Sequence, residues 1–337
     1  MTTPRKRVLS GMRPTGKLHL GHWVGALENW RNLQESYDCF FMVADWHALM
    51  GEYQSPSQIE TSVKENVADW IACGIDPKRS VIFRQSDIPE HLELYMVLSI
   101  LTPLGWVERV PTYKEQLREV KGRDLTTYGF LGYPILQAAD ILLYRAEIVP
   151  VGEDQVAHLE LAREIVRRFI SLYKKAPFPE PKELLTESPK LLGTDGRKMS
   201  KSYQNAIALS DSPEAIRKTT QKMFTDPLRI KMTDPGHPDR CNVYSYYQTF
   251  ERAYAPAVYD YCTNAKKGCT ECKADLGERL GKKLEPIREK SETLLKDEGE
   301  IIKILEEGKK KAKAIASGTM REVRQLVGLA SGDGERA

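Results

Sequence analysis

Short apolar runs alternate with helical patterns through the first half of the chain. The runs Arg7–Ser10, Asp38–Ala44 and Val81–Phe83 predict strands, and the second is apolar almost throughout, as in a strand that is buried on both faces. Between the runs, apolar positions recur at helical spacing in Gly21–Gln34 and Ser57–Ile71, which predicts two amphipathic helices. This alternation predicts an α/β fold, with a parallel sheet covered by helices.

Beyond the third run the pattern becomes mainly helical. Residues 87–146 are expected to be largely helical, Ile148–Pro150 to add a strand to the sheet, and Asp154–Tyr173 to form a long helix. After a proline-rich surface segment, the chain from Pro213 onward is again mostly helical, including Pro286–Glu307 with its alternating charges. The second half therefore predicts an all-helical region behind the α/β part.

Length and composition fit this two-part organisation. The 337 residues suggest two domains, and 41% apolar with 29% charged residues is the balance of a globular protein. We expect an α/β domain over 1–202, a helical domain over 203–330 and a disordered tail over 331–337. No apolar run could span a membrane and the N-terminus lacks the apolar core of a secretion signal, so we expect a cytoplasmic protein.

The distribution of charge is more informative than its sum. A net charge of +3 does not mark a nucleic-acid-binding protein. However, residues 1–202 hold 26 positive and 26 negative side chains, whereas residues 203–337 hold 24 and 21. The excess lies wholly in the helical part, which favours that part as the one that meets a polyanion.

The first candidate site joins a predicted strand to a predicted helix. It reads Arg13-Pro14-Thr15-Gly16-Lys17-Leu18-His19-Leu20-Gly21-His22. Such a junction presents free backbone N–H groups and the positive end of a helix to an anion. Gly21 would allow a ligand ring to approach the backbone, and the two histidines share one helical face. Alone, the segment also fits an ordinary strand–helix turn or a pair of metal ligands.

A second candidate site lies about 180 residues later in the chain. It reads Gly193-Thr194-Asp195-Gly196-Arg197-Lys198-Met199-Ser200-Lys201-Ser202. The glycines permit backbone movement, and lysine is a compact, flexible charge that suits a phosphate chain. A solvated basic loop is the alternative for this segment alone, but the two segments together are far more specific.

Together these segments resemble the two signature motifs of class I aminoacyl-tRNA synthetases. The blocks Tyr133-Pro134-Ile135-Leu136-Gln137-Ala138-Ala139-Asp140 and Val149-Pro150-Val151-Gly152-Glu153-Asp154-Gln155, followed by His158, are similar to tryptophanyl-tRNA synthetases over essentially the whole chain. The resemblance implies a homodimer with a Rossmann-type catalytic domain, helices on both faces of its sheet, and a helical domain that reads the tRNA anticodon. It also implies the reaction: L-tryptophan and ATP give tryptophanyl-adenylate and pyrophosphate, and the tryptophan then passes to the 3′ end of tRNA(Trp).

The resemblance assigns roles to individual residues. Asp140 is implied to accept the indole N–H, and the rest of the tryptophan site is Tyr133, Gln137, Gln155, His47 and Val151. The implied catalytic residues are His19, His22, Lys198 and Lys201. The implied ATP-binding residues are Arg13, Pro14, Thr15, Gly21, His22, Gly152, Glu153, Asp154, Leu191, Lys198, Met199, Ser200, Lys201 and Ser202, with Mg²⁺ accompanying the nucleotide.

The chemistry of the two substrates fits these residue types. A substrate carboxylate is already ionised at pH 7, so the site must align it and stabilise the departing pyrophosphate rather than supply a base. Phenylalanine would leave Asp140 buried without a partner. Tyrosine is the harder competitor because its hydroxyl could also donate, but the block Gly152–Gln155 favours tryptophan. Many family members have Gln at Arg13 and Met at Gln137, which affects fine contacts rather than the location of the pocket.

Four of the six cysteines fall within 32 residues. Their spacing is Cys241-x20-Cys262-x6-Cys269-x2-Cys272, which suits either tetrahedral zinc or an iron–sulfur cluster. Spacing does not choose between these metals, and four unrelated buried thiols are the alternative. A subset of tryptophanyl-tRNA synthetases carries a similar pattern that holds a 4Fe-4S cluster, which implies a structural cluster here.

Two other classes of protein share part of this pattern. A small-molecule nucleotidyltransferase would share the histidine segment but has no need of the helical region and its cysteines. A metal-containing nucleic-acid-binding protein without ligase activity would use Cys241–Cys272 but would not need the lysine segment. The complete pattern therefore favours the synthetase.

Overall fold

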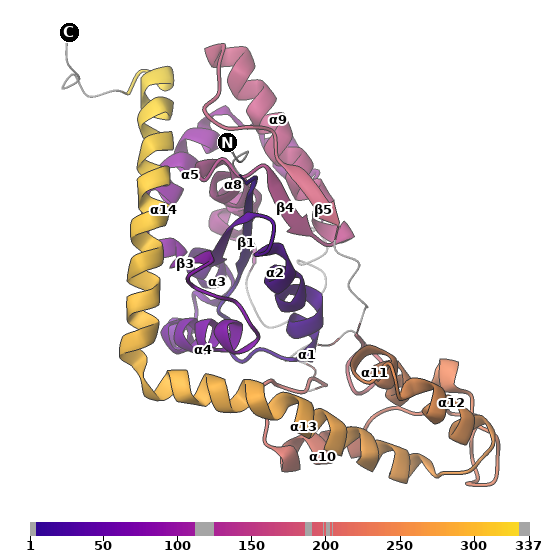
Figure 1. Ribbon diagram of the computed structural model, residues 1–337. Helices are drawn as coiled ribbons and strands as arrows, with labels where there is room; N and C mark the ends of the chain where they lie inside the picture. Colours follow the sequence, from indigo (N-terminus) through magenta and orange to yellow (C-terminus); the bar gives the residue numbers. More distant parts are fainter. Residues whose placement is uncertain are drawn as a thin grey trace.

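The protein is built around one parallel sheet of five strands (Figure 1). The computed structural model describes residues 5–111, 125–185, 191–197, 199, 203 and 205–329. In sheet order the strands are β3 (Ser80–Arg84), β2 (Asp38–Val43), β1 (Arg7–Met12), β4 (Ile148–Val151) and β5 (Lys182–Leu185). This confirms the predicted parallel sheet.

Pairing within the sheet is uneven. β1 and β2 pair along six residues, from Arg7 opposite Asp38 to Met12 opposite Val43, and β2 pairs with β3 along five. By contrast, β1 pairs with β4 only through Val8 and Ile148. β1 and β4 therefore separate from each other toward their carboxyl ends.

Helices cover both faces of the sheet, as predicted. Side chains alternate between faces along a strand, so Phe41 and Val43 join one core cluster while Phe40 and Met42 join the other. The helices of the α/β part are α1 (Leu20–His22), a π-helical turn (Trp23–Leu27), α2 (Glu28–Leu33), α3 (Asp45–Glu52), α4 (Ile59–Ala72), α5 (Glu90–Leu101), α6 (Leu104–Glu108), α8 (Tyr128–Leu143) and α9 (Val156–Tyr173).

The described part of the C-terminal region is mainly helical. Its helices are α10 (Pro213–Gln221), α11 (Asn242–Phe250), α12 (Ala255–Thr263), α13 (Cys269–Lys296) and α14 (Glu298–Val327). The segment Pro286–Glu307 is helical as predicted, but it is divided between α13 and α14, because Asp297 leaves the helical conformation with φ −110° and ψ 70°. The chain turns sharply there (Figure 1).

The last helix returns to the sheet. α14 runs along the edge strand β3 (Figure 1), and Ala312, Ala316 and Met320 are fully buried in a core cluster that they share with strand residues such as Phe83. At Gly308 the two backbones come so close that an added Cβ would lie 1.7 Å from the carbonyl oxygen of Ile82. The edge of the sheet is thereby covered by a helix.

Candidate active site

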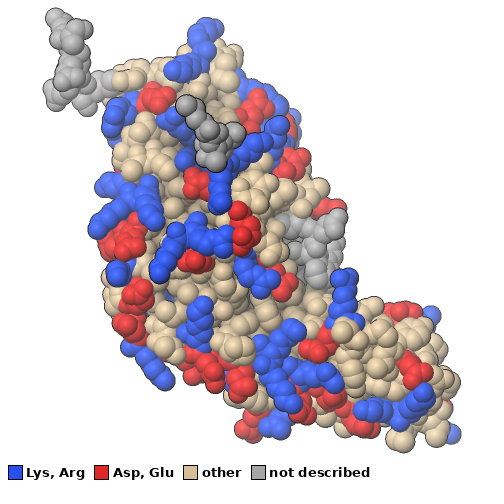
Figure 2. Space-filling view, viewed as in Figure 1, with Lys and Arg blue, Asp and Glu red and all other residues tan. Residues whose placement is uncertain are grey.

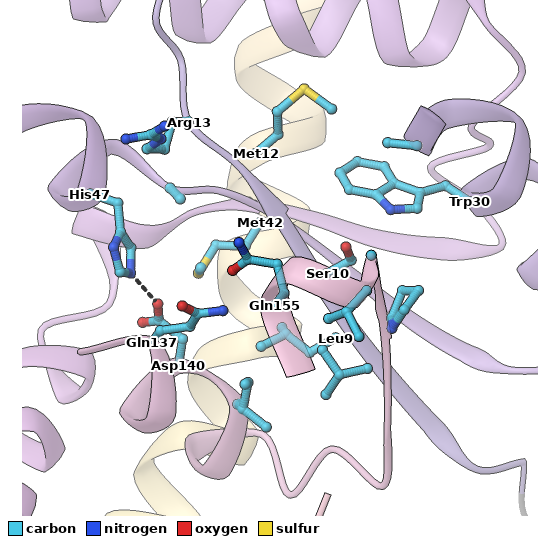
Figure 3. A pocket seen from close by; sticks show the side chains of 18 of the residues that line it. Leu9, Ser10, Met12, Arg13, Trp30, Met42, His47, Gln137, Asp140 and Gln155 are labelled. Atoms are coloured by element: carbon cyan, nitrogen blue, oxygen red, sulfur yellow. Dashed lines mark hydrogen bonds and ion pairs between the residues drawn. The ribbon is translucent and has the colours of Figure 1, made fainter. Parts of the chain in front are cut away.

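A cavity of about 410 Å³ opens at the carboxyl ends of β1 and β4 (Figure 3). The strand order reverses at this pair, since the sheet continues from β1 to β2 and β3 on one side and from β4 to β5 on the other. Ligands of parallel α/β sheets bind at such a point, because the connections leave the two strands in opposite directions. The topology therefore provides the site.

All six residues predicted to contact tryptophan lie on the wall of this cavity. They are His47, Tyr133, Gln137, Asp140, Val151 and Gln155. Three of them come from α8 at positions i, i+4 and i+7, a spacing that places side chains on one face of a helix. Helical spacing therefore brings these three side chains together on the wall of the cavity.

Three hydrogen bonds hold Asp140 in the wall of the cavity. Its carboxylate, which is 2% exposed, accepts hydrogen bonds from Nε2 of His47 at 2.7 Å, Nε2 of Gln85 at 2.7 Å and Nδ1 of His91 at 2.6 Å. Burial acts to raise the pKa of Asp140, but the hydrogen bonds from His47 and His91 outweigh it and the pKa is lowered. The group is therefore a carboxylate at neutral pH.

Tyr133 lies on the same wall and contacts a second buried histidine. Its hydroxyl is 3.3 Å from Nε2 of His158. Burial lowers the pKa of His158 to about 4, so the imidazole is neutral at pH 7. A neutral Nε2 can accept the Tyr133 proton, which leaves the phenol oxygen oriented by the protein rather than by the ligand.

The predicted ATP-binding residues are divided between the cavity wall and its surroundings. Arg13 and Gly152, which directly follow β1 and β4, line the cavity, whereas the next residues in the chain do not. At Gly152 an added Cβ would lie 2.7 Å from Oδ1 of Asp154. The Asp154 side chain also accepts a hydrogen bond from Gln155, so the glycine permits a tight turn into α9.

The rings of the two histidines in the first segment lie against each other at a tilt of 38°. Their ring centroids are 3.8 Å apart, and the backbone N–H of His19 donates to Nδ1 of His22 at 3.2 Å. The expected reason for Gly21 needs correction in part. A Cβ at Gly21 would meet the His19 ring at 3.0 Å and the sulfur of Met199 at 3.3 Å, so the glycine also accommodates protein side chains.

The two signature segments meet in space. Leu20 donates its backbone N–H to Ile207, and Leu209 donates to Leu18. Met199 is 8% exposed and belongs to the same core cluster as Leu18 and Leu20, and Leu191 packs against that cluster. The predicted site residues Lys198, Ser200, Lys201 and Ser202 lie outside the described residues.

The turn before the lysines is held by many hydrogen bonds. Gly196 has a φ of +81°, and Asp195 accepts from Asn205 and from Arg197. A hydrogen bond from Asn205, with further ones from Arg197, holds the pKa of Asp195 at about 2. From α11, Asn242 donates to the carbonyl of Gly193 and Tyr246 donates to that of Leu192, each at 2.7 Å. The base of the lysine segment is therefore fixed to the helical region.

Several residues of the site escaped the sequence analysis. Gln85 and His91 are fully buried and hold Asp140 from behind. Gln85 directly follows β3 and could have been found by the rule that polar residues at carboxyl strand ends face the site, whereas His91 had no signal. The π-helical turn was also unexpected, and its Gly25 and Ala26 line the cavity. Such turns are frequent at functional sites.

The four clustered cysteines lie in one neighbourhood of the helical region. Burial raises the pKa of Cys272 to about 11, and negative charge on Cys241 and Cys262 raises it further. The hydroxyl of Tyr261 donates to the Cys272 sulfur at 3.3 Å. Within the described part of the chain, no three His, Cys, Asp or Glu side chains are grouped so that they could hold a metal ion. The metal site therefore stays a prediction.

Comparison with known sequences identifies relatives along nearly the whole chain. The family described as tRNA synthetases class I (W and Y) matches residues 1–285. A tryptophan–tRNA ligase of Thermotoga maritima is 50% identical over 326 residues, which covers 96% of this chain and 99% of the relative. One of Aquifex aeolicus is 42% identical and is also covered almost completely.

Solved structures lead to the same family. The tryptophanyl-tRNA synthetase of Campylobacter jejuni, crystallised with ADP and tryptophan, superimposes with a TM-score of 0.88 at 34% identity over 96% of this chain and 100% of that one. The Mycoplasma pneumoniae enzyme gives a TM-score of 0.81 at 26% identity. With its cavity at the β1–β4 switch point and its two signature segments in contact, the chain belongs to the tryptophanyl-tRNA synthetases of class I.

Proposed function

We propose that the cavity activates L-tryptophan with ATP and that the protein then transfers tryptophan to the 3′ end of tRNA(Trp). One observation carries this proposal. An ionised, buried carboxylate, Asp140, lines the same cavity as Arg13, the first residue of the first signature segment. The cavity therefore offers both an acceptor for the indole N–H and a cation for a carboxylate or phosphate.

The amino acid is proposed to bind with its indole ring against α8. Asp140 accepts the indole N–H, and Gln155 and Tyr133, which reach the same space (Figure 3 shows Gln155 above Asp140), contact the amino-acid backbone. Apolar atoms of Met42 and Val151 line the ring pocket. The family departure Gln137 adds one polar group beside the ring. Nothing in this arrangement requires a general base, since the substrate carboxylate is the nucleophile.

Activation is proposed to depend on the two signature segments. The tryptophan carboxylate attacks the α-phosphorus of ATP. The bond between the α-phosphorus and the oxygen that bridges to the β-phosphate breaks, and pyrophosphate leaves. His19 and His22, together with Lys198 and Lys201, stabilise the charge on the phosphates, while Gly21 and Gly152 let the nucleotide approach the backbone. Mg²⁺ bound to the phosphates supplies further charge neutralisation. The adenylate then reacts with the terminal ribose of tRNA, releasing AMP.

Exchange of labelled pyrophosphate into ATP tests this function. Exchange should depend on L-tryptophan and should be absent with L-tyrosine, because a phenol would bring an extra oxygen to a pocket built around one N–H donor. Charging of tRNA(Trp) should follow under the same conditions. Exchange with tyrosine alone would show that the protein is a tyrosyl-tRNA synthetase, the second candidate of this class, and RNA binding without any exchange would favour a non-enzymatic binding protein.

The helical region is proposed to contact tRNA. We divide the chain into a catalytic domain (1–202) and an anticodon-binding domain (203–330), while the predicted tail (331–337) lies outside the described residues. The positive excess of the second part supports this division. On the face shown in Figure 2, basic and acidic side chains are interspersed, so recognition would rely on local basic patches rather than on one broad field.

We further propose that the four cysteines hold a 4Fe-4S cluster with a structural role. Burial, with further contributions from neighbouring thiols of the group, raises the pKa of Cys241, Cys262 and Cys272. Cysteine sulfur is a soft ligand that suits iron–sulfur clusters and zinc. The described side chains are not grouped so that they could hold a metal ion, so the proposal rests on the spacing of the four cysteines and on the family resemblance.

Anaerobic purification tests the cluster. The protein should be brown, with broad absorbance near about 400 nm and four iron atoms per chain when the cluster is complete. Replacing Cys272 with serine should abolish the colour, whereas Cys73→Ser, a core thiol outside the group, should retain it. Colourless protein with stoichiometric zinc would instead support the alternative metal.

Assembly and location complete the proposal. Four exposed apolar side chains, Met96, Ile100, Leu104 and Tyr128, lie on α5, α6 and the start of α8, and both α5 and α6 pack against α8. Exposed apolar side chains on neighbouring helices favour an interaction surface here, and a second copy of the chain is its proposed occupant. None of the described helices is long and apolar enough to span a membrane. We propose a cytoplasmic homodimer.

A further inference from the structure

We propose that His91, held by Tyr144, is a positioning residue that fixes the Asp140 carboxylate so that one acceptor site alone faces the substrate. This inference rests on the proposed role of Asp140 as the acceptor of the indole N–H. It goes further because it assigns the selectivity to buried residues that no ligand touches.

Most acceptor positions of the Asp140 carboxylate are occupied by protein donors. An ionised carboxylate has about four acceptor positions, two on each oxygen. Oδ1 accepts from Gln85 at 2.7 Å and from His91 at 2.6 Å, which fills both of its positions. Oδ2 accepts from His47 at 2.7 Å, as the dashed line in Figure 3 shows. Within the part of the chain that the structure describes, one acceptor position on Oδ2 therefore remains.

The donors reach the two Asp140 oxygens from different sides. Gln85 and His91 are both 0% exposed and do not line the cavity, whereas Asp140 and His47 do. The Oδ1 oxygen is thus bonded from behind, and Oδ2 is the oxygen directed toward the pocket. A ring with one N–H donor matches the one remaining acceptor.

The hydroxyl of Tyr144 holds the His91 ring in its orientation. Its Nε2 lies 2.7 Å from the hydroxyl of Tyr144, which is itself 0% exposed. Burial keeps the pKa of Tyr144 well above its ordinary value, so the phenol retains its proton and can donate it to Nε2. That hydrogen bond places the imidazole proton on Nδ1, where it points at Asp140.

Aromatic packing fixes the same side chains in place. The His91 ring is stacked on Phe83 with centroids 6.3 Å apart, and the Tyr144 ring is stacked on Phe40 at 5.5 Å. Phe40 and Phe83 belong to neighbouring strands of the sheet. The position of the carboxylate is therefore set by the sheet through Tyr144 and His91.

The consequence concerns selectivity between ligands. A carboxylate that is free to rotate could form a hydrogen bond with ligand donors at several positions. A fixed carboxylate forms a strong hydrogen bond only with a donor at the position of the indole N–H. Without His91 or Tyr144, Asp140 should still bind tryptophan but should distinguish less well between rings with and without the N–H group. A purely structural role would weaken binding of both rings alike.

The test compares two substrates in pyrophosphate exchange. One is L-tryptophan, and the other is its analogue with sulfur in place of the ring N–H, 3-benzothienyl-L-alanine. In the wild type the kcat/KM ratio should strongly favour tryptophan. We expect His91→Leu to lower this ratio at least tenfold and Tyr144→Phe to lower it about threefold, mainly through the KM for tryptophan, while kcat/KM for the analogue stays within threefold.

Two further variants separate the possible outcomes. His91→Asn supplies an amide N–H near the position of Nδ1 and should restore most of the ratio, and Asp140→Ala should abolish it. An equal loss for both substrates in His91→Leu and Tyr144→Phe, or an unchanged ratio, would overturn the proposal while leaving Asp140 as the acceptor. A wild-type ratio near one would instead refute the assignment of Asp140 itself, and the positioning role with it.

Discussion

Asparagine at position 140 should lower kcat/KM for tryptophan by about 10²- to 10³-fold. The amide has only one oxygen, so it cannot accept from Gln85 and His91 and at the same time present an acceptor to the cavity. With its oxygen directed at these buried donors, its NH₂ group would face the indole N–H. Loss of a charged hydrogen bond and an unpaired donor together cost about 3–4 kcal/mol. Steady-state pyrophosphate exchange measures the effect.

Gln137→Met is the matched control for this variant. Gln137 lies on the same helix, one turn before Asp140, and also lines the cavity. Methionine, which is similar in length to glutamine, leaves the carboxylate network intact, so kcat/KM should change less than about tenfold. The KM for ATP should be unchanged in both variants. An equal loss in the two variants would mean that general polarity of the pocket matters rather than the Asp140 acceptor.

Alanine at position 308 should destabilise the fold by about 3 kcal/mol or more. Its Cβ would lie 1.7 Å from the carbonyl oxygen of Ile82, and a backbone atom in the middle of a strand cannot rotate away as a side chain can. α14 would have to move off β3 and expose the buried face that includes Ala312 and Met320. Thermal unfolding should show a midpoint lower by about 5–10 °C.

Gly318 provides the control on the same helix. An added Cβ there meets nothing within 4 Å, so Gly318→Ala should stabilise the protein by up to about 1 kcal/mol through helix propensity. If Gly308→Ala proved as stable as Gly318→Ala, the close contact between α14 and the edge strand would be refuted. Because Gly318 does not line the tryptophan cavity, the exchange kinetics of the folded Gly318→Ala protein should be unchanged.

The central strands were predictable because their signal is local. β2 is buried along nearly its whole length, and a continuous apolar run identifies such a strand without knowledge of its neighbours. β5, at Lys182–Leu185, has an exposed, mixed-character sequence and was missed, because an edge strand is defined by the strand that it pairs with. The break at Asp297 was missed for a related reason, since the charged pattern continues across it.

The residues of the candidate site also differ in whether the sequence predicts their positions. The positions of Tyr133, Gln137 and Asp140 on one helical face follow from their spacing. Gln85 and His91 come from a strand end and a different helix, and only packing brings them to Asp140. The approach of Leu18–Leu20 to Ile207–Leu209 likewise joins segments that are distant in the chain.

The sequence by itself determined the alternation of strands and helices, the residues of the two signature segments and the face of the helix that carries Asp140. These features depend on side-chain periodicity and on local residue order. The tertiary structure decided the order of the strands, the return of α14 to the sheet edge and the environment of Asp140. Such features depend on contacts between distant segments, because close packing and the pairing of buried polar groups select one arrangement among many that the local pattern permits.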